Sequence, residues 1–157
     1  MLFRSEWYRS SDQEPVLAEA SERFKLLSRG RYTGLELSDE ERPSIRAKSS
    51  GGALLTPAAL SEGTRDQLYL ALRLATLERH AVVGNALPIA VDDIFMTFDE
   101  RRTEAALRVL DGMADRFQVI VFTHHEHVIR SAVKELPEGR CHVHQLPGQG
   151  DGRHVVP

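Results

Sequence analysis

The chain has 157 residues, a net charge of −3 and a single cysteine, Cys141. Its length fits one domain with a sizeable core, and the near balance of 20 basic and 23 acidic residues excludes a strongly basic nucleic-acid-binding domain. One cysteine excludes a disulfide scaffold, and no apolar run approaches the ~18–20 residues that span a bilayer, so we expect a soluble, cytoplasmic protein without membrane contact.

The first part of the chain predicts one helix and two short strands. Pro15 suits a first turn, apolar residues follow at helical spacing, and Gly30 suits an end, so we expect an amphipathic helix over residues 15–29. Residues 32–37 and 44–47 predict short strands on either side of an acidic turn.

Strands and helices alternate in the rest of the chain. Residues 64–82 carry apolar side chains on two faces, which predicts a helix that is buried on two sides. Short apolar runs predict buried strands over 88–91, 118–123 and 141–145, and helical spacing predicts helices over 99–115 and 125–135. This alternation predicts an α/β fold with a mostly parallel sheet flanked by helices.

Small and polar residues occupy the start of the long helix. Ser61 is a good N-cap, and Gly63 lets another backbone approach closely. The free N–H groups and positive dipole end of a helix start make an anion site. The alternative is a capped helix with no ligand.

Two carboxylates, Asp92 and Asp93, follow the apolar run that begins at Pro88. The carboxyl end of a buried strand is where open α/β sheets bind ligands. Adjacent carboxylates repel each other, so we expect one to bind a metal and the other to take a different task. Hard oxygen ligands suit Mg²⁺. The alternative is an acidic turn.

Thr123 and His124 end the next apolar run in the same way. A histidine at the carboxyl end of a strand can contact a phosphate or order a water molecule. The alternative is a solvated histidine at the start of a loop, which the neighbouring His125 and His127 make more plausible for any one of them.

The order and spacing of these segments resemble the C-terminal lobe of an ATP-binding-cassette (ABC) ATPase head, a P-loop NTPase. Residues 60–63 resemble the signature motif of that family, and residues 89–93 resemble its Walker B strand. Phe98 and Asp99 fall at the D-loop position, and His124 falls at the position of the switch histidine.

Within this superfamily the chain is similar to the YhaN-like branch, which belongs with the SMC and double-strand-break-repair ATPases. The similarity is carried by residues 63–75, 92–95 and 122–125. It implies that Asp92 holds Mg²⁺, that Asp93 orients the attacking water, and that His124 contacts the γ-phosphate side of ATP. The residues implied to contact the nucleotide, or to lie at the junction with a second head, are Ser61, Glu62, Gly63, Gln67 and Asp99.

Two departures from the family pattern qualify the resemblance. Asp93 stands where most cassette ATPases have Glu, although Asp also fits the YhaN-like pattern. No Walker A motif, G-x-x-x-x-G-K-S/T, occurs in the 157 residues, and the loop that contributes a Gln to the metal is also missing. In SMC-type proteins the two halves of the head lie at opposite ends of a long chain, so the resemblance implies the C-terminal half of a head that is inactive alone.

This interpretation implies an organisation and a set of partners. Residues 1–30 would end a coiled-coil arm, residues 31–146 would form the lobe, and residues 147–157 would form a flexible tail. The implied partners are the N-terminal Walker A lobe of the same protein, a second head in an ATP-dependent homodimer, DNA, and a nuclease. The implied role is in DNA repair or chromosome maintenance.

Two other functions stay open from the residues alone. One is a non-catalytic lobe that only docks on a partner. The other is a metal-dependent hydrolase, with one cluster at Asp92, Asp93, His124, His125 and His127 and a second at Cys141, His142 and His144.

Overall fold

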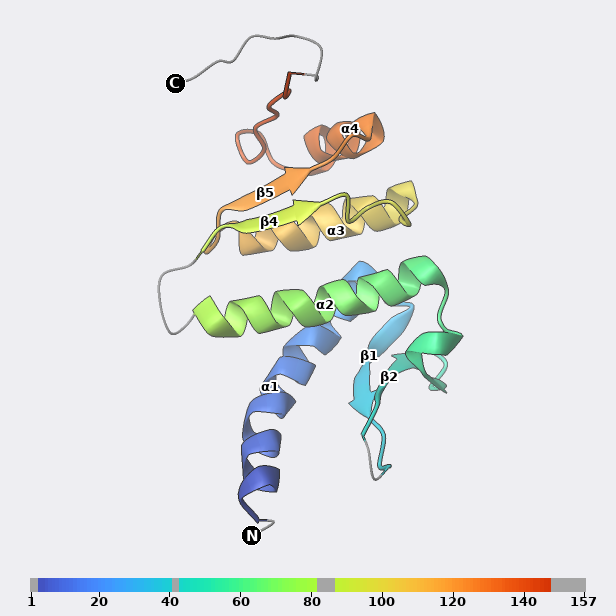
Figure 1. Ribbon diagram of the computed structural model, residues 1–157. Helices are drawn as coiled ribbons and strands as arrows, with labels where there is room; N and C mark the ends of the chain where they lie inside the picture. Colours follow the sequence, from blue (N-terminus) through green and yellow to red (C-terminus); the bar gives the residue numbers. More distant parts are fainter. Residues whose placement is uncertain (1–2, 41–42, 82–86, 148–157) are drawn as a thin grey trace.

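The computed structural model describes residues 3–40, 43–81 and 87–147. These residues form four α-helices, five β-strands and one short 3₁₀ helix (Figure 1). In chain order the elements are α1 (Phe3–Leu27), β1 (Tyr32–Leu37), β2 (Ile45–Ser49), β3 (Leu54–Leu55), η1 (Pro57–Ala59), α2 (Glu62–Ala81), β4 (Ile89–Asp92), α3 (Glu100–Met113), β5 (Val119–Phe122) and α4 (Glu126–Glu135). The predicted α/β fold class is confirmed.

The strands form two separate sheets. β1, β2 and β3 make an antiparallel sheet in that order. β4 and β5 are parallel neighbours, with Ile89 opposite Val119 and Asp92 opposite Phe122. The connection between them contains α3, which supplies the long crossover that a parallel pair requires. In the described part of the chain, the parallel sheet therefore has two strands.

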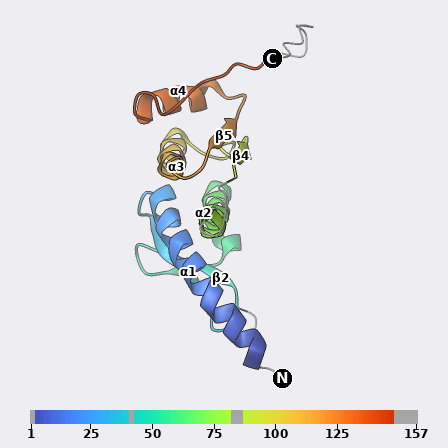
Figure 2. The same ribbon diagram turned by 90° about the vertical axis from the view of Figure 1, so that its left-hand side faces the viewer.

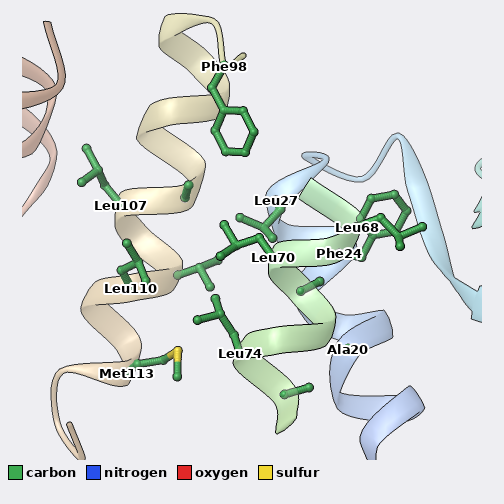
Figure 3. Close-up of a cluster of buried hydrophobic side chains, with 14 of the residues drawn as sticks. Ala20, Phe24, Leu27, Leu68, Leu70, Leu74, Phe98, Leu107, Leu110 and Met113 are labelled. Atoms are coloured by element: carbon green, nitrogen blue, oxygen red, sulfur yellow. The ribbon is translucent and has the colours of Figure 1, made fainter. Parts of the chain in front are cut away.

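Helix α2 lies at the centre of the hydrophobic core, between α1 and α3 (Figure 3). On the α1 side Leu68 lies beside Phe24, and on the α3 side Leu74 faces Met113 (Figure 3). All four side chains are buried. The predicted burial of this helix on two sides is therefore confirmed.

Helix α1 is longer than predicted. It spans Phe3–Leu27, so Pro15 lies inside the helix and not in its first turn. The predicted start at residue 15 is wrong because proline favours a first turn without preventing helical residues before it, at the loss of one backbone hydrogen bond. Figures 1 and 2 show the N-terminal part of α1 extending away from the strands and the other helices.

The predicted strand over residues 141–145 is wrong. Residues 141–147 form no strand, and all of them except the partly buried Cys141 are exposed. An alternating pattern makes a strand only where a neighbouring strand accepts its hydrogen bonds, and no such neighbour is found in the described ranges. The predicted tail over 147–157 lies almost entirely outside the described residues. No described helix is long and apolar enough to cross a membrane.

Two leucines of α2 test this arrangement. Leu74 packs toward α3 and is 1% exposed, whereas Leu77, one turn later, is 41% exposed. We expect Leu74→Ala to lower the free energy of unfolding by about 2–5 kcal/mol, because it leaves a cavity in the core. Leu77→Ala should change it by less than about 1 kcal/mol. Urea unfolding followed by circular dichroism measures both, and equal losses would contradict the position of α2.

Candidate functional site

The parallel register of β4 and β5 brings the polar residues that follow them to one edge of the sheet. Asp92 lies opposite Phe122, and the backbone N–H of Asp93 donates to the carbonyl oxygen of Phe122 at 3.0 Å. Asp93 and His124 therefore leave adjacent strand ends side by side. This edge is the carboxyl end at which α/β sheets bind ligands.

Asp93 and His124 contact each other directly. His124 Nδ1 lies 2.8 Å from Asp93 Oδ2. Partial burial on its own raises the pKa of the Asp93 carboxyl, but hydrogen bonds and charge from His124, with a hydrogen bond involving Thr123, outweigh it and hold that pKa below its ordinary value. Asp93 is therefore ionised at neutral pH. Its other oxygen, Oδ1, is buried without a hydrogen-bond partner in the structure.

Asp92 lies in a different environment from Asp93. It is the last residue of β4 and is exposed, and its neighbour across the sheet is the half-exposed Phe122. An exposed carboxylate at a strand end supplies the hard oxygen ligands that Mg²⁺ prefers. The donor chemistry of Asp92 therefore fits the predicted magnesium site.

The structure brings together only part of the predicted metal-hydrolase cluster. The ligand atoms of Asp93, His124 and His125 all lie within 4.8 Å of one another. Asp92 and His127 are not members of this group, and no group containing Cys141, His142 or His144 occurs among the described residues. The predicted second cluster is therefore wrong: His142 and His144 are exposed beyond the last strand.

The signature-like segment lies at the start of α2. Ser61 directly precedes the helix, and its carbonyl oxygen accepts from the backbone N–H of Arg65 at 2.8 Å. The Ser61 hydroxyl also lies 2.8 Å from the hydroxyl of Thr64. Ser61 and Glu62 are exposed, whereas Gly63 and Thr64 are buried. Exposure at the start of α2 is thus limited to Ser61 and Glu62, and the anion site stays a prediction.

Gly63 is in close contact with the segment that follows β4. A Cβ atom at Gly63 would lie 2.6 Å from the carbonyl oxygen of Thr97 and 2.5 Å from Nη1 of Arg102. The Thr97 hydroxyl donates to Asp66 Oδ2 at 2.6 Å. The predicted close approach of a backbone at Gly63 is confirmed, and Thr97 is its partner.

Asp99 caps the N-terminus of α3 close to the start of α2. Its carboxylate accepts from the backbone N–H of Arg102 at 2.9 Å, and Arg102 Nη2 in turn lies 3.4 Å from Thr64 Oγ1. Arg102 thus joins the start of α3 to the start of α2. The only local sequence signal for Arg102 is its place three residues after Asp99 at a helix start, and this signal does not predict the contact with Thr64.

Gln67 is placed differently from the other signature residues. Its side chain is 1% exposed, and its amide Nε2 donates to the carbonyl oxygen of Leu27 at 2.6 Å. Gln67 therefore links α2 to the end of α1, and its contact with ATP stays a prediction. A pocket of about 450 Å³ lies beside it, and Thr64, Asp99, Arg101 and Arg102 are among the residues that line this pocket.

No protein-family model matches the chain. Over 115 residues, or 72% of its length, the chain is 35% identical to a Bacillus subtilis protein named uncharacterized protein YhaN. The matched part is 12% of that protein, so the chain spans a small part of its relative.

Solved structures of SMC heads share the fold. A structure described for ATP-driven dimerization and DNA-stimulated activation of SMC ATPases matches with a TM-score of 0.67 at 21% identity, over 81% of this chain and 77% of that one. The Pyrococcus furiosus Smc head domain with an extended coiled coil, bound to the C-terminal domain of ScpA, matches with a TM-score of 0.60 at 22% identity. This match covers 76% of this chain and 30% of that one. The SMC head domain from Thermotoga maritima matches with a TM-score of 0.57 at 22% identity, over 82% of this chain and 45% of that one. The chain is a partial homologue of YhaN with an SMC-type head fold.

The resemblance to the C-terminal lobe of this head class is thereby confirmed.

Gly63 offers a direct test of the contact between the start of α2 and Thr97. We expect Gly63→Ala to lower the free energy of unfolding by about 1–3 kcal/mol, because a backbone carbonyl cannot move aside without shifting its segment. Thermal or urea unfolding measures the loss.

Gly112 provides the matched control. It is exposed inside α3, and a Cβ added there meets no atom within 4 Å. Gly112→Ala should raise the free energy of unfolding by about 0.5–1 kcal/mol, since alanine favours a helix over glycine. The same stabilisation at Gly63 would mean that the start of α2 does not contact Thr97.

Proposed function

We propose that this chain is the C-terminal lobe of an ATP-hydrolysing head, in which it supplies the signature segment, the Walker B strand, the D-loop residue and the switch histidine. The observation that carries the proposal is the ionised Asp93, hydrogen-bonded to His124 at 2.8 Å at the carboxyl edge of β4 and β5. The YhaN homology and the SMC-type fold support an ATPase-head role.

The residues of this edge divide the chemistry between them. Phosphoryl transfer needs positioned reactants and neutralised charge more than covalent chemistry. Asp93 keeps one buried oxygen free of hydrogen bonds, and in our proposal this carboxylate orients and deprotonates the attacking water. His124 holds the Asp93 carboxylate and faces the γ-phosphate side of the nucleotide. Asp92 holds Mg²⁺, which would neutralise phosphate charge when bound.

We propose the outer face of the parallel sheet as the surface on which a second lobe docks. Val91, Val119 and Val121 pack against the core, so the alternation of side chains turns Ile120 and Phe122 to the opposite face. Phe122 is 45% exposed. In Figure 2, α3 and α4 both lie on one side of β4 and β5.

Parallel sheets are normally covered on both faces, and two strands alone make a marginal sheet. YhaN extends far beyond the matched residues. We therefore assign the outer face of β4 and β5 to the Walker A lobe of the same protein. Without that lobe, the chain is expected to lack ATPase activity, because the Walker A backbone and its Lys supply most phosphate contacts.

The start of α2 is assigned to the second head. Ser61 and Glu62 are exposed at a helix N-terminus, where backbone N–H groups and the dipole favour an anion. In the proposal these residues and Gly63 contact the γ-phosphate of ATP held by a second head, with Asp99 at the junction. ATP would then join two heads, and hydrolysis would separate them. The partners DNA and a nuclease, and a role in DNA repair or chromosome maintenance, rest on the resemblance alone.

Asp93→Asn tests the assignment of the water-activating residue. The experiment uses the chain reassembled with the Walker A lobe of its parent protein. We expect the turnover number to fall by ~10²–10⁴-fold, because the amide keeps the shape of the carboxylate but loses its basic oxygen. ATP affinity should change little, and ATP-bound dimers should accumulate in size-exclusion chromatography.

Asp39→Asn is the control, since Asp39 is an exposed acid in the turn between β1 and β2, on the other sheet. It should leave turnover and dimerisation unchanged. Normal hydrolysis by Asp93→Asn would assign the water to another residue. Loss of ATP binding by the same variant would make Asp93 a metal ligand.

Phe122→Asp tests the lobe interface independently of hydrolysis. A carboxylate on the outer face of β5 would be buried unpaired under the Walker A lobe, so affinity between the two lobes should fall by at least ~10-fold. Val133→Asp is the matched control because Val133 is 66% exposed on α4, on the other side of the strands. Pull-down or calorimetry of the two lobes measures the difference, and equal affinities for both variants would remove the outer face from the interface.

A further inference from the structure

We propose that Asp93, His124 and His125 form a binding site for a transition-metal dication, with Zn²⁺ as its representative, distinct in its ligands from the magnesium site assigned to Asp92. The three side chains come from the ends of β4 and β5, and their ligand atoms lie within 4.8 Å of one another. Among the described residues this is the one group of three or more His, Cys, Asp or Glu side chains that could hold a metal ion.

Two side-chain atoms of these residues make no hydrogen bond in the structure. Asp93 Oδ1 and His125 Nε2 are both buried and make no hydrogen bond in the structure. Buried polar atoms in folded proteins are nearly always paired, and each unpaired one costs about 1–3 kcal/mol. A cation bound by Asp93 and His125 through these atoms would give each of them a partner. The role proposed for Asp93 in hydrolysis gives none to His125 Nε2.

The spacing of the group is close to that of ligands around one ion. Zn–N and Zn–O distances of about 2.0–2.2 Å place two tetrahedral ligand atoms roughly 3.3 Å apart. His124 Nδ1 and Asp93 Oδ2 are 2.8 Å apart, and no pair in the group exceeds 4.8 Å. The rings of His124 and His125 lie side by side, with centroids 3.9 Å apart. Small side-chain rotations would therefore bring three ligands onto one cation.

The ligand types decide the class of cation. Two imidazoles and one carboxylate suit Zn²⁺, Co²⁺ or Ni²⁺, whereas Mg²⁺ prefers an all-oxygen shell. Three protein ligands also leave a fourth position open to water or to an anion. The group is thus expected to select Zn²⁺ over Mg²⁺.

Zinc at this group would occupy the carboxylate of Asp93. In the proposed function Asp93 orients the attacking water. On that function rests the further expectation that Zn²⁺ inhibits ATP hydrolysis by the assembled head. The binding itself does not depend on that function, so the two statements are tested separately.

Calorimetric titration of the full chain with Zn²⁺ tests the binding, and Co²⁺ titration reports ligand number through its visible absorption. We expect one Zn²⁺ per chain, and we expect an excess of Mg²⁺ not to displace it. His125→Ala and the conservative His125→Gln should each weaken the affinity for Zn²⁺ by at least ~10-fold, with circular dichroism confirming that both variants fold.

Two controls separate this site from other histidines. His127→Ala should leave the affinity unchanged, although the His127 ring centroid lies only 5.4 Å from that of His125. The triple variant Cys141→Ser, His142→Ala, His144→Ala should also keep it. Absence of one-to-one binding, or binding that survives both His125 substitutions, would overturn the site. In the reassembled head, Zn²⁺ should lower the turnover number of the wild type and leave that of His125→Ala unchanged. A reassembled head with no ATPase activity would overturn the proposed function but not the zinc site.

Discussion

The candidate site depends on one constraint, which is that helix α2 is fixed on two sides at once. On the α1 side, Gln67 donates to the carbonyl oxygen of Leu27, and Arg23 forms a partly buried ion pair with Glu78. On the α3 side the helix packs through buried leucines (Figure 3). A helix held on both faces cannot slide along its axis, so Gly63 at its start meets the segment after β4 at a fixed point.

That segment connects the two halves of the site. It begins at Asp93 and runs to Phe98, and it is anchored by Phe95 and Phe98, whose buried rings make an edge contact at 6.1 Å. Thr97 within it is hydrogen-bonded to Asp66 of α2. The start of α2 and the Asp93 edge therefore cannot move independently unless this hydrogen bond breaks or the two rings leave the core. In an ATPase head this is the connection that would link contact with a second head to the hydrolytic residues.

Local sequence patterns predicted the parts of this arrangement that local physics determines. The apolar runs before Asp92 and His124 located the two parallel strands, and the two-faced apolar pattern of residues 64–82 predicted the burial of α2. The patterns failed where distant partners decide. The continuation of α1 before Pro15, the unpaired segment 141–147, and the contacts of Arg102 and Gln67 all depend on which residues the fold brings together, and no spacing within a short window records this.

The different environments of Asp92 and Asp93 arise from the backbone at a single residue. Side chains alternate along a strand, so Asp92 lies on the outer face of β4. If the strand continued, Asp93 would point to the core face, where Ile89 and Val91 lie. An ionised carboxylate on that face would be buried without water, which is costly. Asp93 instead adopts a left-handed conformation, with a φ of 44°, which ends the strand and brings its carboxylate to His124. Left-handed backbone is strained for most residues but comparatively well tolerated by Asp, so one backbone conformation both ends the strand and gives two neighbouring carboxylates different environments.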